Sequence, residues 1–214
     1  VAPLADTYVD ASSLSSAYGR EEYLKVSDSS FGLSVALLMF DLSGVSHSNA
    51  SFEAKLRLRG LSSTSTLPYI IGVHWCVNNT WDEDTLTFGN FSYFVRTKPE
   101  SIITVGSENV WYEWKVTDFV STAIRENYKN VTLVLEAEET VKGNTFALFY
   151  SKDQQQLPPS ECNPQLVFTY HDIGGVPLDI IGKVILGVLA TGGIVFTAYR
   201  FLKKPAKKRH RLSS

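Results

Sequence analysis

Residues 51–60, SFEAKLRLRG, decide the fold class of this chain. Apolar and charged side chains alternate along them: Phe52, Ala54, Leu56 and Leu58 are apolar, and Glu53, Lys55, Arg57 and Arg59 are charged. Because successive side chains of a strand point to opposite faces, one face is buried and the other meets water. The pattern predicts a sheet that is packed on one side.

Short segments of the same kind occur on both sides of this strand, with turn residues between them. Strands are predicted at 7–9, 23–27, 34–40, 51–59, 69–75, 92–96, 102–105, 111–116, 131–136, 145–150 and 165–170. The nearly continuous apolar run SVALLMFDL, residues 34–42, is typical of a central strand covered on both faces. The sequence therefore predicts an all-β domain over residues 1–172, an antiparallel β-sandwich of jelly-roll-like form.

One segment departs from this pattern. In TDFVSTAIRENY, residues 117–128, apolar residues recur at helical spacing behind Thr117 or Asp118 as the N-cap. We expect one short helix there.

Near the end of the chain a second kind of pattern begins. Residues 180–202, IIGKVILGVLATGGIVFTAYRFL, are apolar apart from Lys183 and Arg200, whose charged ends can reach the membrane surface. As a helix this segment is about 34 Å long, enough for a hydrocarbon core of about 30 Å. It predicts one transmembrane α-helix, joined to the domain by a short linker at 173–179.

The basic tail at 203–214, which begins with Lys203 and Lys204, predicts the orientation of this helix. Lys and Arg clusters beside a span are retained in the cytoplasm, so the N-terminal domain is expected outside a cell membrane that the chain crosses once. Four Asn-x-Ser/Thr sites lie on that outer side and are candidate glycosylation sites, at Asn49, Asn78, Asn90 and Asn130.

The formal charge of the N-terminal domain restricts the classes of molecule that it can bind. The first 176 residues hold 12 basic and 21 acidic side chains, a formal charge of −9, which argues against nucleic acid as a partner. The two cysteines, Cys76 and Cys162, are predicted to form a disulfide in an extracytoplasmic domain; the alternative is two buried thiols.

The sequence contains little that suggests catalysis. Its four histidines lie in no nucleophile or metalloprotease motif, so we expect no enzyme activity. The acidic run Asp82, Glu83 and Asp84 is either a solvated turn or a calcium-binding loop, completed by oxygens such as those of Asn79 or Asn90. No other cofactor is expected.

Two tyrosines are the candidates for a sugar-stacking surface. In a sandwich most aromatic side chains are core, and only those on a face in contact with water can stack on a sugar ring. Tyr93 and Tyr112 are the residues for which we expect this position.

The order of motifs resembles the DNRLRE-type β-sandwich domains of secreted and cell-surface proteins. The resemblance rests on ADTYVDASSLSSAYGREEYLKVSDSS (5–30), VALLMFDLSGV (35–45), AKLRLRG (54–60), VHWCVNNTWDEDTLTFGN (73–90), WYEWKVTDFV (111–120), NVTLVLEAE (130–138) and PQLVFTY (164–170). Some domains of this type are classed as carbohydrate-binding modules, including alginate binders. The resemblance implies a core containing Phe40, Leu56, Trp81, Trp111, Trp114, Val116 and Phe168.

Three functions fit these features. The leading expectation is a noncatalytic, glycosylated structural or interaction module of an archaeal-type cell envelope, in contact with the lipid bilayer and other envelope proteins. The alternatives are a carbohydrate-binding surface receptor for a polysaccharide, and an accessory single-span subunit of a larger membrane complex.

Overall fold

A computed structural model of the chain describes residues 1–29, 32–45, 51–63, 68–91, 94–140, 146–155 and 157–171. The chain divides into two compact units, Val1–Thr169 and Tyr170–Ser214. The architecture below is that of the first unit, because only Tyr170 and His171 of the second are described.

The predicted membrane anchor lies outside the described residues. This holds for the linker at 173–179, for the span at 180–202 with Lys183 and Arg200, and for the tail at 203–214 with Lys203 and Lys204. Among the residues that are described, no helix is both long enough and apolar enough to span a bilayer.

The described residues form ten strands and three short helices. The strands are β1 (Ala5–Asp10), β2 (Tyr23–Ser29), β3 (Gly32–Asp41), β4 (Phe52–Ser63), β5 (Tyr69–Cys76), β6 (Ser101–Val105), β7 (Trp111–Lys115), β8 (Asn130–Ala137), β9 (Ala147–Tyr150) and β10 (Gln165–Tyr170). The helices are α1 (Phe88–Phe91), α2 (Thr117–Arg125) and α3 (Pro159–Cys162). The predicted all-β fold is confirmed, with two more short helices than expected.

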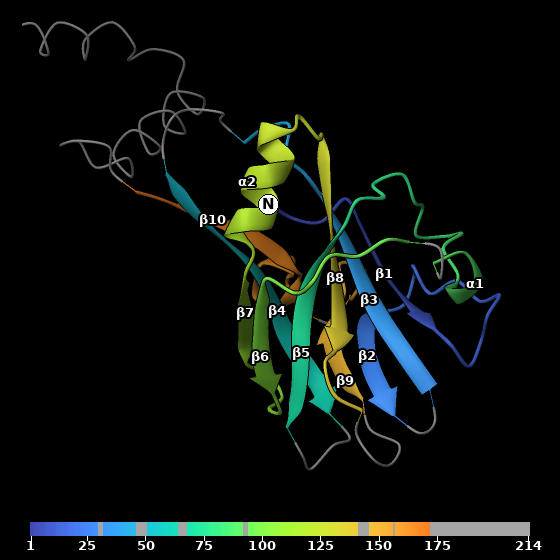
Figure 1. Cartoon of the computed structure of the whole chain (residues 1–214). Coiled ribbons are helices and arrows are strands. Elements are labelled where there is room, and N and C mark those ends of the chain that lie inside the picture. The colour runs from blue at the N-terminus through green and yellow to red at the C-terminus, as the bar shows by residue number, and fades with distance from the viewer. Residues whose placement is uncertain are drawn as a thin grey trace, which may run out of the picture. The chain divides into compact units, whose positions relative to one another are not determined.

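The strands lie in two layers (Figure 1). Strands β1, β3, β8, β5 and β6 form the first layer, and β2, β9 and β4, with β7 and β10 beside β4, form the second. Strand β2 joins the layers, because Ser27–Ser29 pair with β3 while Tyr23–Val26 pair with β9. The result is one antiparallel sheet that folds over on itself around a shared core.

The core between the layers follows the alternation seen in the sequence. Ala54, Leu56 and Leu58 of β4 are fully buried, whereas the charged residues between them keep partial contact with solvent. The side chain of Trp114 on β7 crosses this core, and its Nε1 donates a hydrogen bond to the carbonyl of Ile71 on β5 at 2.9 Å. This contact fixes which face of β7 is turned inward.

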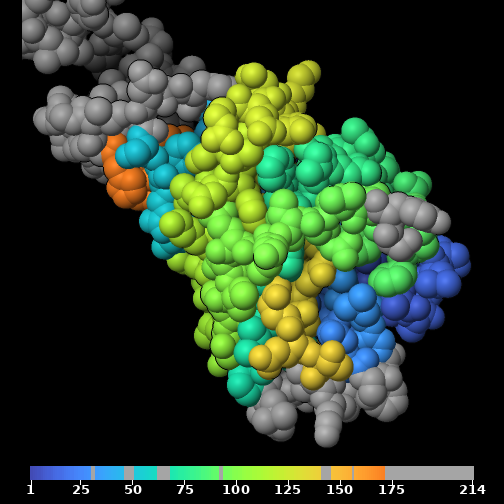
Figure 2. Space-filling model, viewed as in Figure 1, coloured from blue at the N-terminus to red at the C-terminus, as the bar shows by residue number. Residues whose placement is uncertain are grey.

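The outer side of the first layer is covered as well. Between β5 and β6 the chain runs across that layer, as Figures 1 and 2 show in green. Trp81, Leu86 and Phe91 of this segment join a second apolar cluster with Val35, Leu37 and Met39 of β3. Burial of β3 on both faces explains its nearly continuous apolar sequence.

The same segment replaces one predicted strand. Instead of a strand at 92–96, the described residues 94–96 contain only an isolated bridge between Arg96 and Cys76. The apolar side chain of Phe94 packs on the second cluster, which accounts for the apolar character that suggested a strand.

The predicted disulfide is absent, because both cysteines are buried free thiols. Cys76 belongs to the second apolar cluster, outside the first layer. Cys162 lies in α3, where its Sγ is 3.3 Å from the carbonyl of Pro158. The two thiols thus sit in separate local environments, and of the two alternatives the sequence left open, buried thiols is the one that holds.

Helix α2 is confirmed, but its N-terminus is capped from another element. Val116 is the N-cap residue and makes no side-chain cap. The carboxylate of Glu100, just before β6, instead accepts hydrogen bonds from the backbone N–H groups of Asp118 and Phe119, both at 2.9 Å. A carboxylate at this position also interacts favourably with the helix dipole.

Replacing Glu100 by Ala should destabilise the domain by about 1 kcal/mol, because two N–H groups of the first turn lose their acceptor. Urea denaturation followed by tryptophan fluorescence measures the change. Glu100→Gln keeps one acceptor oxygen and should lose less. Equal stability of Glu100→Ala and the wild type would show that water replaces the cap without cost.

The loop between β1 and β2 rests directly on the turn that contains Glu83. A Cβ added to Gly19 would overlap the carbonyl oxygen of Glu83, whereas among the described residues no atom lies within 4 Å of one added to Gly44. Gly19→Ala should therefore cost about 1–3 kcal/mol of unfolding free energy, and Gly44→Ala less than about 0.5 kcal/mol.

Gly44→Ala is the matched control because both substitutions restrict the unfolded chain alike. Thermal denaturation of both variants gives the difference. Equal melting temperatures would mean that the loop does not hold its close approach to Glu83.

Candidate functional site

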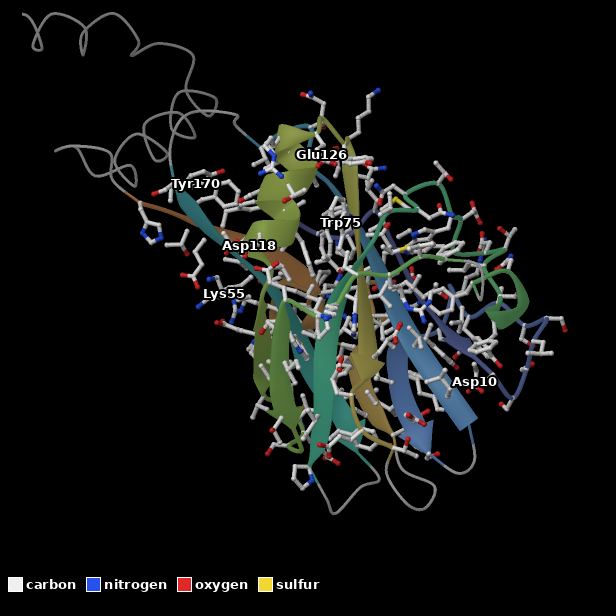
Figure 3. The ribbon with its side chains drawn as sticks, viewed as in Figure 1. Asp10, Lys55, Trp75, Asp118, Glu126 and Tyr170 are labelled. Atoms are coloured by element: carbon white, nitrogen blue, oxygen red, sulfur yellow. The ribbon has the colours of Figure 1, made fainter. Side chains whose placement is uncertain are left out.

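The outer face of the second layer carries a row of charged side chains and one tryptophan. Outward residues of β4 and β7 face each other across the ladder as the pairs Lys55 with Lys115, Arg57 with Glu113, and Arg59 with Trp111. In Figure 3 the label Lys55 marks the place of this surface. We call this surface, made of these six residues and Glu53, the β4–β7 face.

Arg57 stands at the centre of the β4–β7 face. Its guanidinium carbon lies 4.7 Å from the ring centroid of Trp111, a cation–π contact. Its Nε is 2.9 Å from Glu113 Oε1, an ion pair in which the N–H does not point at the carboxylate. The Arg57 side chain as a whole is 29% exposed, although its Nε is buried.

Two further cations extend the row. Lys55 Nζ lies 3.3 Å from Glu113 and 3.8 Å from Glu53, and these are partly exposed ion pairs that add little to stability. Arg59 Nη1 donates a hydrogen bond to the carbonyl of Glu161 at 2.7 Å. Lys55, Arg57, Arg59 and Lys115 outnumber Glu53 and Glu113, so this face is locally positive on a domain whose formal charge is negative.

The chemistry available on this face is that of recognition. An indole ring offers a flat apolar surface to the C–H face of a sugar, and guanidinium groups donate paired hydrogen bonds to carboxylates and hydroxyls. The family resemblance predicts a core position for Trp111, but the side chain is only partly buried. The spacing contained a signal, since Trp111 and Trp114 are three residues apart and lie on opposite faces of a strand.

The two tyrosines predicted for sugar stacking are placed differently. Tyr112 turns inward: its ring packs on the core, and its hydroxyl accepts hydrogen bonds from the N–H groups of Gly106 and Ser107 at 3.0 and 2.7 Å. Tyr93 lies outside the described residues. The aromatic ring of β7 that lies on the outer face is that of the neighbouring Trp111, which is partly buried.

The acidic run after Trp81 does not converge on one point. Asp82 Oδ1 accepts the N–H of Asp84 at 2.9 Å and so closes a turn. Asp84 forms a two-point ion pair with Arg20, with both contacts at 2.7 Å, at the exposed surface. Of the residues proposed to complete a calcium loop, Asn79 makes no hydrogen bond through its buried amide atoms, and Asn90 accepts the N–H of Thr87.

Glu83 instead joins two carboxylates from distant parts of the chain. One ligand oxygen each from Asp6, Glu83 and Asp153 lies within 4.8 Å of the others. Lys152 Nζ is 2.9 Å from Glu83 Oε1 and 2.8 Å from Asp153 Oδ2. Burial raises the pKa of Asp6 to about 7, because desolvation disfavours the charged carboxylate.

The candidate glycosylation sites that can be placed belong to the first layer and its cover. Asn78 and Asn90 are exposed in the segment between β5 and β6, and Asn130 is partly buried at the start of β8. Asn49 lies outside the described residues. Glycans at the three described positions would grow from the layer that does not carry the β4–β7 face.

A search of curated proteins finds no match to the chain. The model of carbohydrate-binding module family 96 matches residues 1–170, which span every described strand. This chain therefore belongs to carbohydrate-binding module family 96.

Proposed function

We propose that the domain is a noncatalytic carbohydrate-binding module whose ligand lies on the β4–β7 face. The observation that carries the proposal is the position of Trp111, partly exposed at the edge of the face and in contact with the Arg57 guanidinium. A ring held in this way offers a stacking surface beside a hydrogen-bond donor, which is the combination that sugars require. The family membership supports a binding role over catalysis.

The local charge favours an acidic polysaccharide as the ligand. Four cations and two carboxylates share the face, and the Arg57 side chain stays partly exposed although it is paired with Glu113. A carboxylate on a sugar ring can compete for these donors while the ring stacks on Trp111. The formal charge of the whole domain is a poor guide here, because screening limits its reach to about 10 Å at 0.1 M salt.

The binding role also changes the order of the three functions that the sequence suggested. Family membership supports the carbohydrate-binding receptor over a purely structural envelope module or an accessory subunit of a membrane complex. Anchoring by residues 180–202, with the domain outside the cell, is part of the proposal: it would hold a polysaccharide close to the membrane surface. Glycans at Asn78 and Asn90 would leave the β4–β7 face accessible.

Binding to a polyuronate and to a neutral glucan, measured by affinity electrophoresis and calorimetry, tests the proposal. Wild type should bind the polyuronate, and Trp111→Ala and Arg57→Gln should each weaken binding about tenfold, the equivalent of about 1.4 kcal/mol. Raising the salt concentration from 50 to 500 mM should weaken binding of the wild type, because part of the attraction is between exposed charges.

Arg125→Ala is the matched control, since it removes an exposed cation from α2, away from this face. Circular dichroism should show that every variant is folded. If Trp111→Ala and Arg57→Gln bind as tightly as the wild type, the β4–β7 face is not the site. Binding to the neutral glucan alone, without salt dependence, would exclude an acidic ligand.

A further inference from the structure

The carboxylates of Asp6, Glu83 and Asp153 form a cluster at one end of the sandwich, where three distant segments meet. Asp6 lies in β1, Glu83 in the turn after Trp81, and Asp153 in the loop after β9. We propose that these three side chains bind a divalent cation of the calcium type and so tie the three segments together. The proposal is independent of the sugar site on the β4–β7 face.

The strongest indication is an unsatisfied oxygen. Asp6 is only 1% exposed, and its Oδ1 is buried without a hydrogen-bond partner. Its other oxygen, Oδ2, accepts the backbone N–H of Lys152 at 2.8 Å, and the backbone N–H of Asp6 donates to Glu83 Oε2 at 3.0 Å. A buried carboxylate oxygen without a donor is costly unless a cation compensates it.

The spacing of the oxygens fits calcium. Calcium takes six to eight oxygen ligands at about 2.3–2.6 Å in flexible geometry, whereas magnesium demands a near-ideal octahedron at about 2.0–2.1 Å and gives up its water reluctantly. The three carboxylates already offer oxygens within 4.8 Å of one another. The three carboxylates are thus close enough to share one ion, and the flexible coordination of calcium suits ligands that come from three separate segments.

Lys152 is the competitor for this position. Its ammonium group contacts Glu83 and Asp153, and it leaves a formal charge of −2 on the four side chains. Burial opposes the charge of Lys152, but hydrogen bonds to Asp153 and Glu83 raise its pKa. Because its side chain is 19% exposed, the ammonium can swing toward solvent when a divalent cation takes its place.

The cluster is open to solvent, which can supply further ligands for the cation. A surface depression beside the cluster is lined by Arg20, Glu22, Glu83, Asp153 and Gln155. Three carboxylates supply at most six oxygens, and water entering through this depression can complete the six to eight that calcium prefers.

Calcium-dependent stability of the full chain, purified in mild detergent and stripped with EDTA, tests the proposal. The melting temperature of wild type should rise on the order of 5 °C at a hundredfold excess of calcium over its dissociation constant. Magnesium at the same concentration should raise it much less. Glu83→Gln and Asp153→Asn should each weaken calcium binding at least about tenfold, since affinity follows ligand charge.

Two more variants separate a specific site from general charge effects. Asp84→Asn changes a carboxylate in the same turn that pairs with Arg20 outside the cluster, and it should keep the calcium shift. Lys152→Met removes the competing ammonium, and it should bind calcium more tightly than the wild type. Absence of a calcium shift in the wild type, an unchanged shift in Asp153→Asn, or unchanged or weaker calcium binding in Lys152→Met would each overturn the proposal.

Discussion

The burial of Trp114 between the two layers is the contact on which the rest of the domain depends. The side chain is fully buried, and its hydrogen bond to Ile71 ties β7 of one layer to β5 of the other. A buried indole contributes a large apolar area, and its N–H needs the partner it has found. Because side chains alternate along a strand, this one contact turns Trp111, Glu113 and Lys115 outward. The binding surface is thus a consequence of core packing.

The two layers differ in how their outer sides are covered. In the first layer, β3 is buried on both sides, since the segment between β5 and β6 adds a second apolar cluster over β3 and β8. In the second layer, the inner side chains of β4 are buried and the charged outer ones are partly exposed, as the alternation along β4 indicates. Its outer side is therefore the one that presents an array of side chains held by regular ladder hydrogen bonds.

Much of this architecture could be predicted from local patterns. Alternation along residues 51–60, the apolar run at 34–42 and helical spacing after Thr117 each depend on neighbours in sequence, and each is confirmed. The predicted disulfide and the core position of Trp111 were wrong. Two cysteines in a sequence do not show whether their segments lie close together in the fold. The family pattern predicts an aromatic residue at Trp111 but not which face of the strand carries it.

The carboxylate cluster shows the limit most clearly. Asp6 and Glu83 are 77 residues apart, and Asp6 and Lys152 are 146 apart, so only the folded topology brings them together. The acidic run is visible in the sequence because its members are adjacent. In the fold, however, Asp82 closes a turn and Asp84 pairs with Arg20, so only Glu83 reaches the cluster. Local sequence identifies a turn, whereas a cluster of this kind depends on how a strand, a turn and a loop from three distant regions meet in the fold.

The position of β4 also has a consequence for how the domain folds. Its partners β7 and β9 come much later in the chain, so ladders on both sides of it close only after long stretches have been ordered. Domains dominated by such non-local pairings fold slowly, because the chain loses conformational entropy in closing long loops before the new contacts offset that loss. Arg57 and Trp111 then come together late, and a folding intermediate that contains only β1 to β6 has no binding surface. Sugar recognition by this module becomes a property of the completed sandwich.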